Sequence, residues 1–202
     1  LVKRHTENVE AYNLFLRGRH CVLRATPEWL AKGKEDLEQA IALDADYALA
    51  YVGMAEYYLA SAFGGFMVPK EALPKVKLAA MEAVSRDDAL AEAHALLATA
   101  RGTGDFDWAG AERESRRALE LNPASSSVHY YYGVQCLRAM GRLDEALSQV
   151  QQAMELDPLS PLYNALLGAV DLEGKTFYYT NPLSSGEPRT PWHSCPRCVG
   201  NI

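Results

Sequence analysis

The stretch Ala118-Leu119-Glu120-Leu121-Asn122-Pro123 recurs, with small changes, three more times in this chain of 202 residues. The other copies are Ala40-Ile41-Ala42-Leu43-Asp44, Ala83-Val84-Ser85-Arg86-Asp87 and Ala153-Met154-Glu155-Leu156-Asp157-Pro158. Their alanines are separated by 43, 35 and 35 residues. A helical pattern that repeats roughly every 34 residues is typical of stacked helical hairpins, so the sequence predicts an all-α solenoid. Such an array offers a binding surface without needing catalytic residues.

The composition limits the partners that the chain can have. A net charge of -6 and the lack of a basic stripe argue against a nucleic-acid surface. The longest apolar candidate, 47–66, is interrupted by Glu56 and two glycines, so we expect no membrane span within this segment. Cys21 and Cys136 fall in helical patterns and are expected to be buried, which favours a reducing, cytoplasmic location. The first residue is Leu1 rather than Met, as in a segment cut from a longer protein.

Apolar residues at helical spacing predict about nine helices. Thr26 fits an N-cap and Pro27 the first turn of the second helix. Paired glycines and a proline within 63–69 interrupt the pattern and account for the longer first step. The first helix carries Tyr12 to Val22 and the second begins at Pro27. The others are expected at about 47–62, 70–86, 89–101, 106–121, 125–140, 142–156 and 159–170.

Small residues recur at positions where the two helices of a hairpin must approach closely. Each lies eleven residues after a repeated Asp or Asn and follows a large residue. The small members are Ala55, Ala98, Gly133 and Gly168, and the large ones are Met54, Leu97, Tyr132 and Leu167. The alanines that open the repeated phrase are expected to serve the same close packing on the second helices.

These features together resemble the tetratricopeptide repeat over roughly residues 8–170. The resemblance implies four hairpins and one further helix, so we divide the chain into an array at 1–170 and an irregular tail at 171–202. The Trp that this family prefers is replaced by Tyr51, His94, His129 and Asn164, and we expect a packing role for the two histidines. The stretch Phe106-Asp107-Trp108-Ala109-Gly110-Ala111-Glu112 is similar to repeats of bacterial signalling proteins, where the array follows a cyclase, kinase or winged-helix domain.

In tetratricopeptide arrays the first helix of each hairpin lines a concave groove, which implies a module for protein–protein interaction rather than an enzyme. Mixed apolar and charged residues in the groove suit an extended peptide or a partner helix. Tyr130 is a candidate anchor because it combines a large ring with a polar tip. The residues expected to face the groove are Phe15, Arg19, Val52, Glu56, Ala95, Thr99, Tyr130, Val134 and Arg138. The helix at 159–170 lacks a hairpin partner, so self-association through its apolar side is a further possibility.

The tail resembles a different family, the β-L-arabinofuranosidase-type glycoside hydrolases with an (α/α)-barrel catalytic domain. The resemblance rests on Gly174–Leu183 and Pro191–Ile202, and it implies a zinc-binding pair of cysteines of which only Cys198 is present. Arg197 occupies the place of the first cysteine, and the upstream ligands have no counterpart. The alternative function is therefore a truncated zinc-binding hydrolase fusion, inactive as it stands.

His193, Cys195 and Cys198 also form a His-x-Cys-x-x-Cys pattern. A structural zinc ion is coordinated by four ligands, and a single Cys-x-x-Cys knuckle supplies too few. We therefore expect no metal site and no cofactor, with these three residues as the weak candidates for a metal. No Gly-rich phosphate loop and no catalytic triad pattern occurs.

Overall fold

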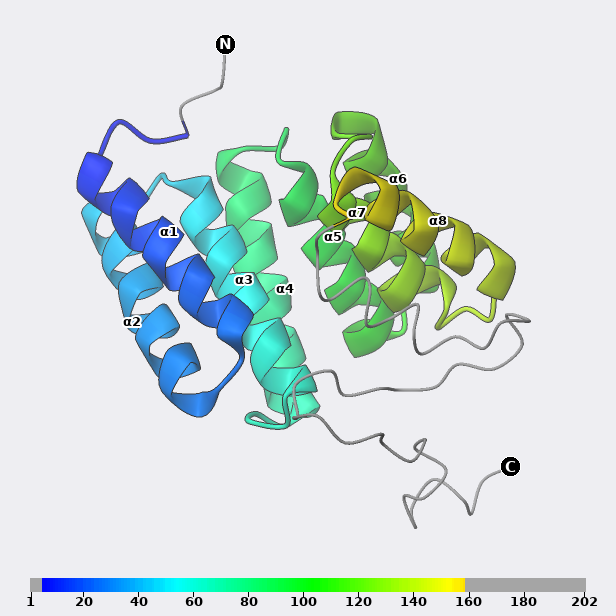
Figure 1. Cartoon of the computed structure of the whole chain (residues 1–202), viewed down its shortest axis with the longest axis horizontal. Coiled ribbons are helices and arrows are strands. Elements are labelled where there is room, and N and C mark those ends of the chain that lie inside the picture. Colours follow the sequence, from blue (N-terminus) through cyan, green and yellow to red (C-terminus); the bar gives the residue numbers. More distant parts are fainter. Residues whose placement is uncertain (1–4, 159–202) are drawn as a thin grey trace.

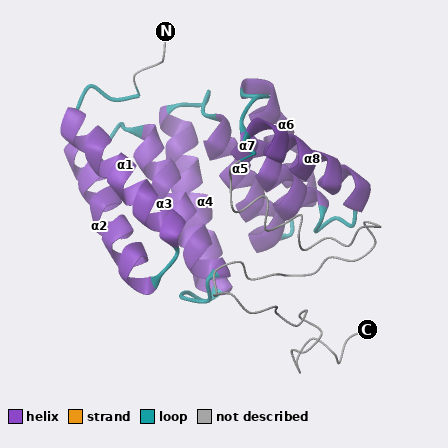
Figure 2. Cartoon of the chain, in the orientation of Figure 1, coloured by secondary structure: helices purple, strands orange, loops and turns teal. Residues whose placement is uncertain are grey.

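The computed structural model describes residues 5–158, which form antiparallel helical hairpins stacked side by side (Figures 1 and 2). The helices pair as α1 with α2, α3 with α4, α5 with α6, and α7 with α8. Short π-helical segments extend α5 and α7. The bounds are α1 Val9–Arg24, α2 Pro27–Leu43, α3 Ala48–Phe63, α4 Pro69–Arg86, α5 Ala91–Thr99, η1 Ala100–Gly104, α6 Trp108–Leu121, α7 Ser126–Tyr131, η2 Tyr132–Leu137 and α8 Leu143–Leu156.

The predicted all-α hairpin solenoid is confirmed for the described residues. Eight helices lie within them, and the predicted break at 63–69 separates α3 from α4. Thr26 caps α2 by accepting a hydrogen bond from the Trp29 amide at 3.5 Å, with Pro27 at the first helical position. The expected ninth helix at 159–170 and the tail at 171–202 lie outside the described residues.

The recurring phrase marks the end of the second helix in each hairpin. The amide of its Asp or Asn donates to the carbonyl of the repeated alanine four residues earlier, at 3.0–3.1 Å in all four copies. Asp44, Asp87 and Asn122 then use their side-chain oxygen to accept from the amide two residues further on, at 3.1–3.2 Å. This side-chain turn stops the helix and directs the chain into the next hairpin.

Small residues bring the two helices of a hairpin into backbone contact, as the pattern predicted. A Cβ on Gly133 would lie 2.9 Å from the Ala146 carbonyl oxygen and 3.1 Å from the Gln149 Cβ. The first hairpin has the same arrangement, since a Cβ on Gly18 would lie 3.0 Å from the Gly33 carbonyl oxygen. Gly18 is therefore the first-hairpin counterpart of Gly133, a match that the repeat pattern alone did not provide.

The largest hydrophobic cluster joins α1 to α5 and extends into η1, and two smaller clusters lie among the later helices. Leu37 on α2 and Leu96 on α5 are fully buried within the large cluster. The repeated alanines 40, 83, 118 and 153 are also fully buried. The clusters therefore run between hairpins as well as within them, which is how a repeat array gains its stability.

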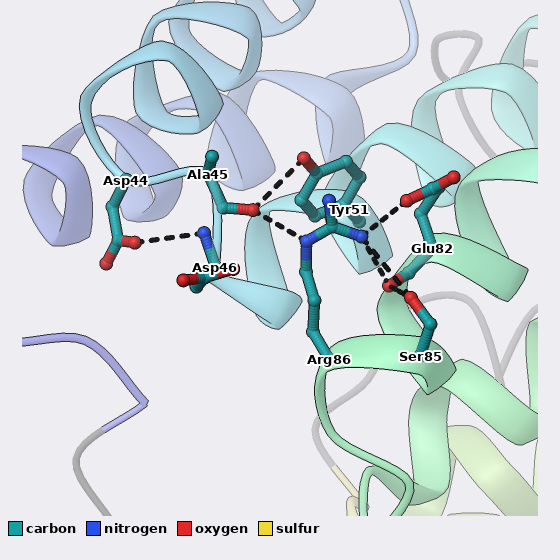
Figure 3. A network of polar contacts seen from close by, with 7 residues as sticks. All are labelled: Asp44, Ala45, Asp46, Tyr51, Glu82, Ser85 and Arg86. Carbon is teal, nitrogen blue, oxygen red and sulfur yellow. Dashed lines mark hydrogen bonds and ion pairs between the residues drawn. The ribbon is translucent and has the colours of Figure 1, made fainter.

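A polar junction fastens the first hairpin to the second (Figure 3). Arg86, at the end of α4, donates from Nε to the Ala45 carbonyl oxygen at 2.6 Å, and Tyr51 donates to the same oxygen at 3.2 Å. The Arg86 guanidinium also lies over the Tyr51 ring, 4.0 Å from its centroid. Glu82 accepts from Arg86 and holds the guanidinium in place. The turn that follows α2 is thereby held by the hairpin next to it.

Each turn inside a hairpin contains one residue in the left-handed backbone region. These residues are Ala25 (φ 49°), Gly65 (φ 74°), Phe106 (φ 58°) and Gly141 (φ 75°). Glycine adopts this conformation without steric cost, whereas Ala25 and Phe106 carry a Cβ that crowds the backbone. The first and third turns are therefore more strained than the second and fourth.

Candidate functional site

An ion pair joins the first helices of the first two hairpins. Arg19 on α1 and Glu56 on α3, both expected on the groove side, make two parallel contacts. The Nε–Oε2 distance is 3.0 Å and the Nη2–Oε1 distance is 3.1 Å. This bidentate geometry is the strong form of an arginine–carboxylate pair, and it fixes α1 relative to α3 on the side where the first helices adjoin.

The two partners of this pair lie in different surroundings. The Glu56 side chain is 10% exposed and that of Arg19 is 39% exposed. Burial raises the pKa of Glu56, and the neighbouring Arg19 guanidinium opposes that rise. The attraction of Glu56 in turn raises the pKa of Arg19. The pair is therefore a desolvated carboxylate held by a cation that reaches the surface.

A second carboxylate, Glu92 on α5, lies close enough to act on both members of the pair. Its negative charge raises the pKa of Arg19 and also that of Glu56. Glu92 accepts a hydrogen bond from the Ser125 hydroxyl at 3.2 Å, and Ser125 lies 3.0 Å from the Ser127 hydroxyl. We call Arg19, Glu56, Glu92 and Ser125 the first-helix polar cluster. The cluster contains two carboxylates and one guanidinium, and its residues come from α1, α3, α5 and the N-cap of α7.

The sequence pattern did not single out Glu92, although a signal for it existed. Glu92 lies three residues before Ala95, which was expected to face the groove, and positions three apart share a helix face. Extending each groove position by one turn toward the helix N-terminus would have found Glu92 on α5 and Ser127 on α7.

Five of the nine residues expected to line the groove are buried instead. Their side chains are covered because the first helices of neighbouring hairpins pack directly against each other. Phe15, for example, packs edge-on against Tyr47 with ring centroids 5.4 Å apart. Thr99 donates its hydroxyl to the Ala95 carbonyl oxygen at 3.0 Å. The buried five are Phe15, Val52, Ala95, Thr99 and Val134.

The remaining expected groove residues retain contact with solvent. Tyr130 is half-buried and meets Tyr131 edge-on, with ring centroids 5.5 Å apart. Arg138 is exposed and donates from Nε to the Val134 carbonyl oxygen at 3.0 Å. Together with Arg19 and Glu56, these residues reduce the candidate surface to a polar and aromatic set on α1, α3, α7 and the turn after η2.

A polar clasp ties the two helices of three hairpins together and so orients the first helices. His94 Nδ1 lies 2.8 Å from Glu114 Oε2, and His129 Nδ1 lies 2.7 Å from Gln149 Oε1. The other ring nitrogen of each histidine lies 3.0 Å from a carbonyl oxygen six residues earlier. In the first hairpin Arg17 takes the same role, with two contacts of 2.6 Å to Asp36. The packing role expected for the two histidines is confirmed, and hydrogen bonds accompany it.

The described residues contain no group of three or more His, Cys, Asp or Glu side chains placed to hold a metal ion. Within the same range no helix combines the length and hydrophobicity that crossing a bilayer requires. Cys21 and Cys136 are buried and are not joined in a disulfide, as expected. The weak metal candidates His193, Cys195 and Cys198 lie outside the part of the chain that the structure describes.

Two family models match the chain. A tetratricopeptide repeat model matches residues 103–170, and the model for the β-L-arabinofuranosidase GH127 catalytic domain matches residues 140–202. The second match agrees with the resemblance of the tail and begins earlier than that resemblance. Its described portion includes α8, which is the second helix of the fourth hairpin. The fold of the array is typical of proteins without catalytic activity.

Known proteins match the array as well. The transcriptional regulator HilA of Salmonella typhimurium is 28% identical over 151 residues, covering 75% of this chain and 27% of that protein. HilA of Salmonella typhi gives the same values. The chain thus spans about a quarter of the length of the curated relatives that it matches.

A solved structure matches the fold. The thermophilic TPR protein TTC0263 of Thermus thermophilus superposes with a TM-score of 0.62 at 19% identity, covering 78% of this chain and 79% of that one. The predicted resemblance is thereby confirmed, and the helical array of this chain is a tetratricopeptide-type repeat array.

Proposed function

We propose that the array is a protein-interaction module of a bacterial regulatory or signalling protein, and that it binds an extended peptide or a partner helix along α1, α3, α5 and α7. The first-helix polar cluster carries the proposal. Arg19 pairs with Glu56 there, whereas Glu92 accepts from the Ser125 hydroxyl, so a cationic side chain of a partner can pair with the Glu92 carboxylate. Tyr130 supplies an aromatic contact on α7 of the kind that anchors partners.

Several observations support the regulatory part of this proposal. HilA is a transcriptional regulator by name, and its matching region covers most of the described array. The buried thiols of Cys21 and Cys136 favour a reducing location, and we propose the cytoplasm. We infer that the array itself binds protein rather than nucleic acid and performs no reaction.

The test is selection of peptides from a random library displayed on phage, followed by affinity measurement on the purified protein. We expect enriched peptides to contain Lys or Arg beside an apolar residue. The double variant Glu92→Gln/Tyr130→Ala should weaken binding at least about tenfold, equivalent to about 1.4 kcal/mol. The matched control is Glu38→Gln, which removes an exposed carboxylate on α2. Equal affinities for the double variant and wild type would refute the assignment of this surface.

The glycoside hydrolase match supports a second proposal, a truncated zinc-binding hydrolase fusion that is inactive as it stands. The candidate ligands are His193, Cys195 and Cys198. Metal analysis of the purified protein tests it. A zinc content near one per chain, lost in Cys195→Ser/Cys198→Ser, supports the proposal, and a content near zero removes it.

A further inference from the structure

An apolar stripe runs along the outer side of α1, the first helix of the array. Val9, Leu16 and Leu23 are spaced seven residues apart, and Tyr12 lies beside them. At 100° per residue all four fall within an arc of about 60°. Their exposed fractions are 71% for Val9, 46% for Tyr12, 45% for Leu16 and 73% for Leu23. A seven-residue apolar spacing is the pattern with which one helix packs along another.

The position of Leu16 is covered by other side chains in the later hairpins. With Gly18 aligned to Ala55, Ala98 and Gly133, the counterparts of Leu16 are Gly53 on α3, Leu96 on α5 and Tyr131 on α7. A Cβ on Gly53 would lie 2.6 Å from Leu37 of the preceding hairpin. Leu96 is fully buried, and Tyr131 packs against the large core cluster. The position of Leu16 thus belongs to the face by which these hairpins stack, and it is exposed on α1, the first described helix.

The charges beside the stripe point to what covers it. Glu10 and Arg24 are exposed on the same flank of the stripe, at opposite ends of α1 and two heptads apart. Two copies of α1 packed antiparallel around a two-fold axis would place Glu10 of each copy beside Arg24 of the other. The same arrangement would place Leu16 against Leu16 at the axis and Val9 against Leu23. A parallel two-fold arrangement would place this flank of the two copies on opposite sides of the contact, so that Glu10 and Arg24 could not pair.

Arg17 lies on this flank near the axis, where its own counterpart would approach. Its charge is balanced within its own chain, because Asp36 makes two contacts of 2.6 Å with it. We infer that the stripe is a self-association surface and that a second copy of this chain docks on it, α1 against α1 in antiparallel orientation, forming a symmetric dimer. Such an isologous contact closes on itself.

The first test is sedimentation equilibrium of the full chain over a range of concentrations. We expect a monomer–dimer equilibrium for the wild type and a monomer for Leu16→Glu. The matched control is Leu78→Glu on α4, where Leu78 is 62% exposed and lies away from the stripe. Helical content by circular dichroism verifies that both variants fold. A wild-type monomer at 100 µM, about tenfold above a Kd of 10 µM, or a Leu16→Glu variant that remains dimeric, would overturn the inference.

The second test reverses the charges. Glu10→Arg and Arg24→Glu should each raise the dimer dissociation constant about tenfold, and the double variant should restore it. Arg24 also stacks on Trp29, 4.7 Å from its ring centroid, so the restoration rather than either loss carries the test. A double variant as weak as the sum of the singles would rule out the antiparallel pairing.

Discussion

At the scale of single residues, the left-handed backbone of Ala25 has a measurable cost. A Cβ in this region costs about 1–2 kcal/mol. Glycine avoids this steric cost but loses more conformational entropy on folding, so the substitution regains only part of it. Ala25→Gly should therefore raise the free energy of unfolding by about 0.5–1 kcal/mol, measured by urea denaturation. Ala31→Gly, at an exposed position in the second turn of α2, is the control and should lower it by about 1 kcal/mol. Shifts of the same sign in both variants would contradict the account.

The Arg19–Glu56 pair predicts a stability that depends on pH. Arg19→Ala leaves the Glu56 carboxylate desolvated without its cation, which should cost about 1–3 kcal/mol at pH 7, toward the lower end because Arg19 is partly exposed. Burial raises the folded-state pKa of Glu56 above its ordinary 4.5, so the folded chain binds the proton more tightly. The stability of the variant should therefore fall as the pH rises through the interval above 4.5.

Thermal or urea unfolding of Arg19→Ala between pH 4 and pH 8 measures this dependence. The control adds Glu56→Gln to the same background, which removes the titrating group and should flatten the profile. A profile for Arg19→Ala that stays parallel to that of the double variant would show that Glu56 is not the titrating group.

At the scale of elements, Arg142 fastens α6 to the start of α8. It donates to Glu112 on α6 at 2.7 Å and to Glu145 on α8 at 2.6 and 2.7 Å. Hydrogen bonds and attraction from Arg142 hold the pKa of Glu112 and of Glu145 below the ordinary 4.5. Stability from these groups is therefore present above pH 4.5 and is lost as the pH falls through their lower folded-state pKa values.

Arg142→Gln should destabilise the protein at pH 7 and approach wild-type stability in acid, as measured by urea unfolding at several pH values. Salt at 1 M should shrink the difference at pH 7, because these charges lie near the surface. Arg117→Gln is the control, since Arg117 pairs with Glu120 within α6 alone. An effect of Arg142→Gln that is equal at pH 7 and pH 3 would exclude the electrostatic explanation.

Local sequence rules predicted the elements well because the features that end and pair these helices are local. The Asp or Asn after each repeated alanine makes its turn with atoms two and four residues away, so its role is visible in the sequence. The rotation of each first helix about its own axis, which decides the residues that face the groove, was harder to predict. Val52 and Thr99 occupy positions expected to face the groove, yet side chains from neighbouring hairpins cover them. That coverage depends on residues distant in the sequence, so the local spacing of residues cannot predict it.

At the scale of the whole molecule, the separate hydrophobic clusters predict uneven stability along the array. The large cluster joins α1 to α5, whereas a small one joins α6, η2 and α8. Leu137→Ala, at a fully buried position of the small cluster, should cost about 2–5 kcal/mol. Hydrogen exchange measured by mass spectrometry should accelerate in α6–α8 and change little in α1 and α2.

Leu37→Ala is the matched substitution in the large cluster, at a buried leucine of α2. It should accelerate exchange in α1–α4 more than in α8, because each hairpin contacts mainly its neighbours. Uniform acceleration along the chain in both variants would mean that the array unfolds as one cooperative unit.

The two π-helical segments explain how the third and fourth hairpins accommodate one residue more than the consensus repeat. Each lies in a step of 35 residues, one more than the roughly 34 of the consensus repeat. A π-helical turn takes up one extra residue without lengthening a loop. Deleting one residue within Ala100–Gly104 should convert the wide turn to an α-helical one and keep the stack in register. A deletion in the middle of α6 would instead rotate every later side chain of that helix by about 100°. The first helices of these hairpins are therefore the places where evolution or engineering can insert and remove single residues.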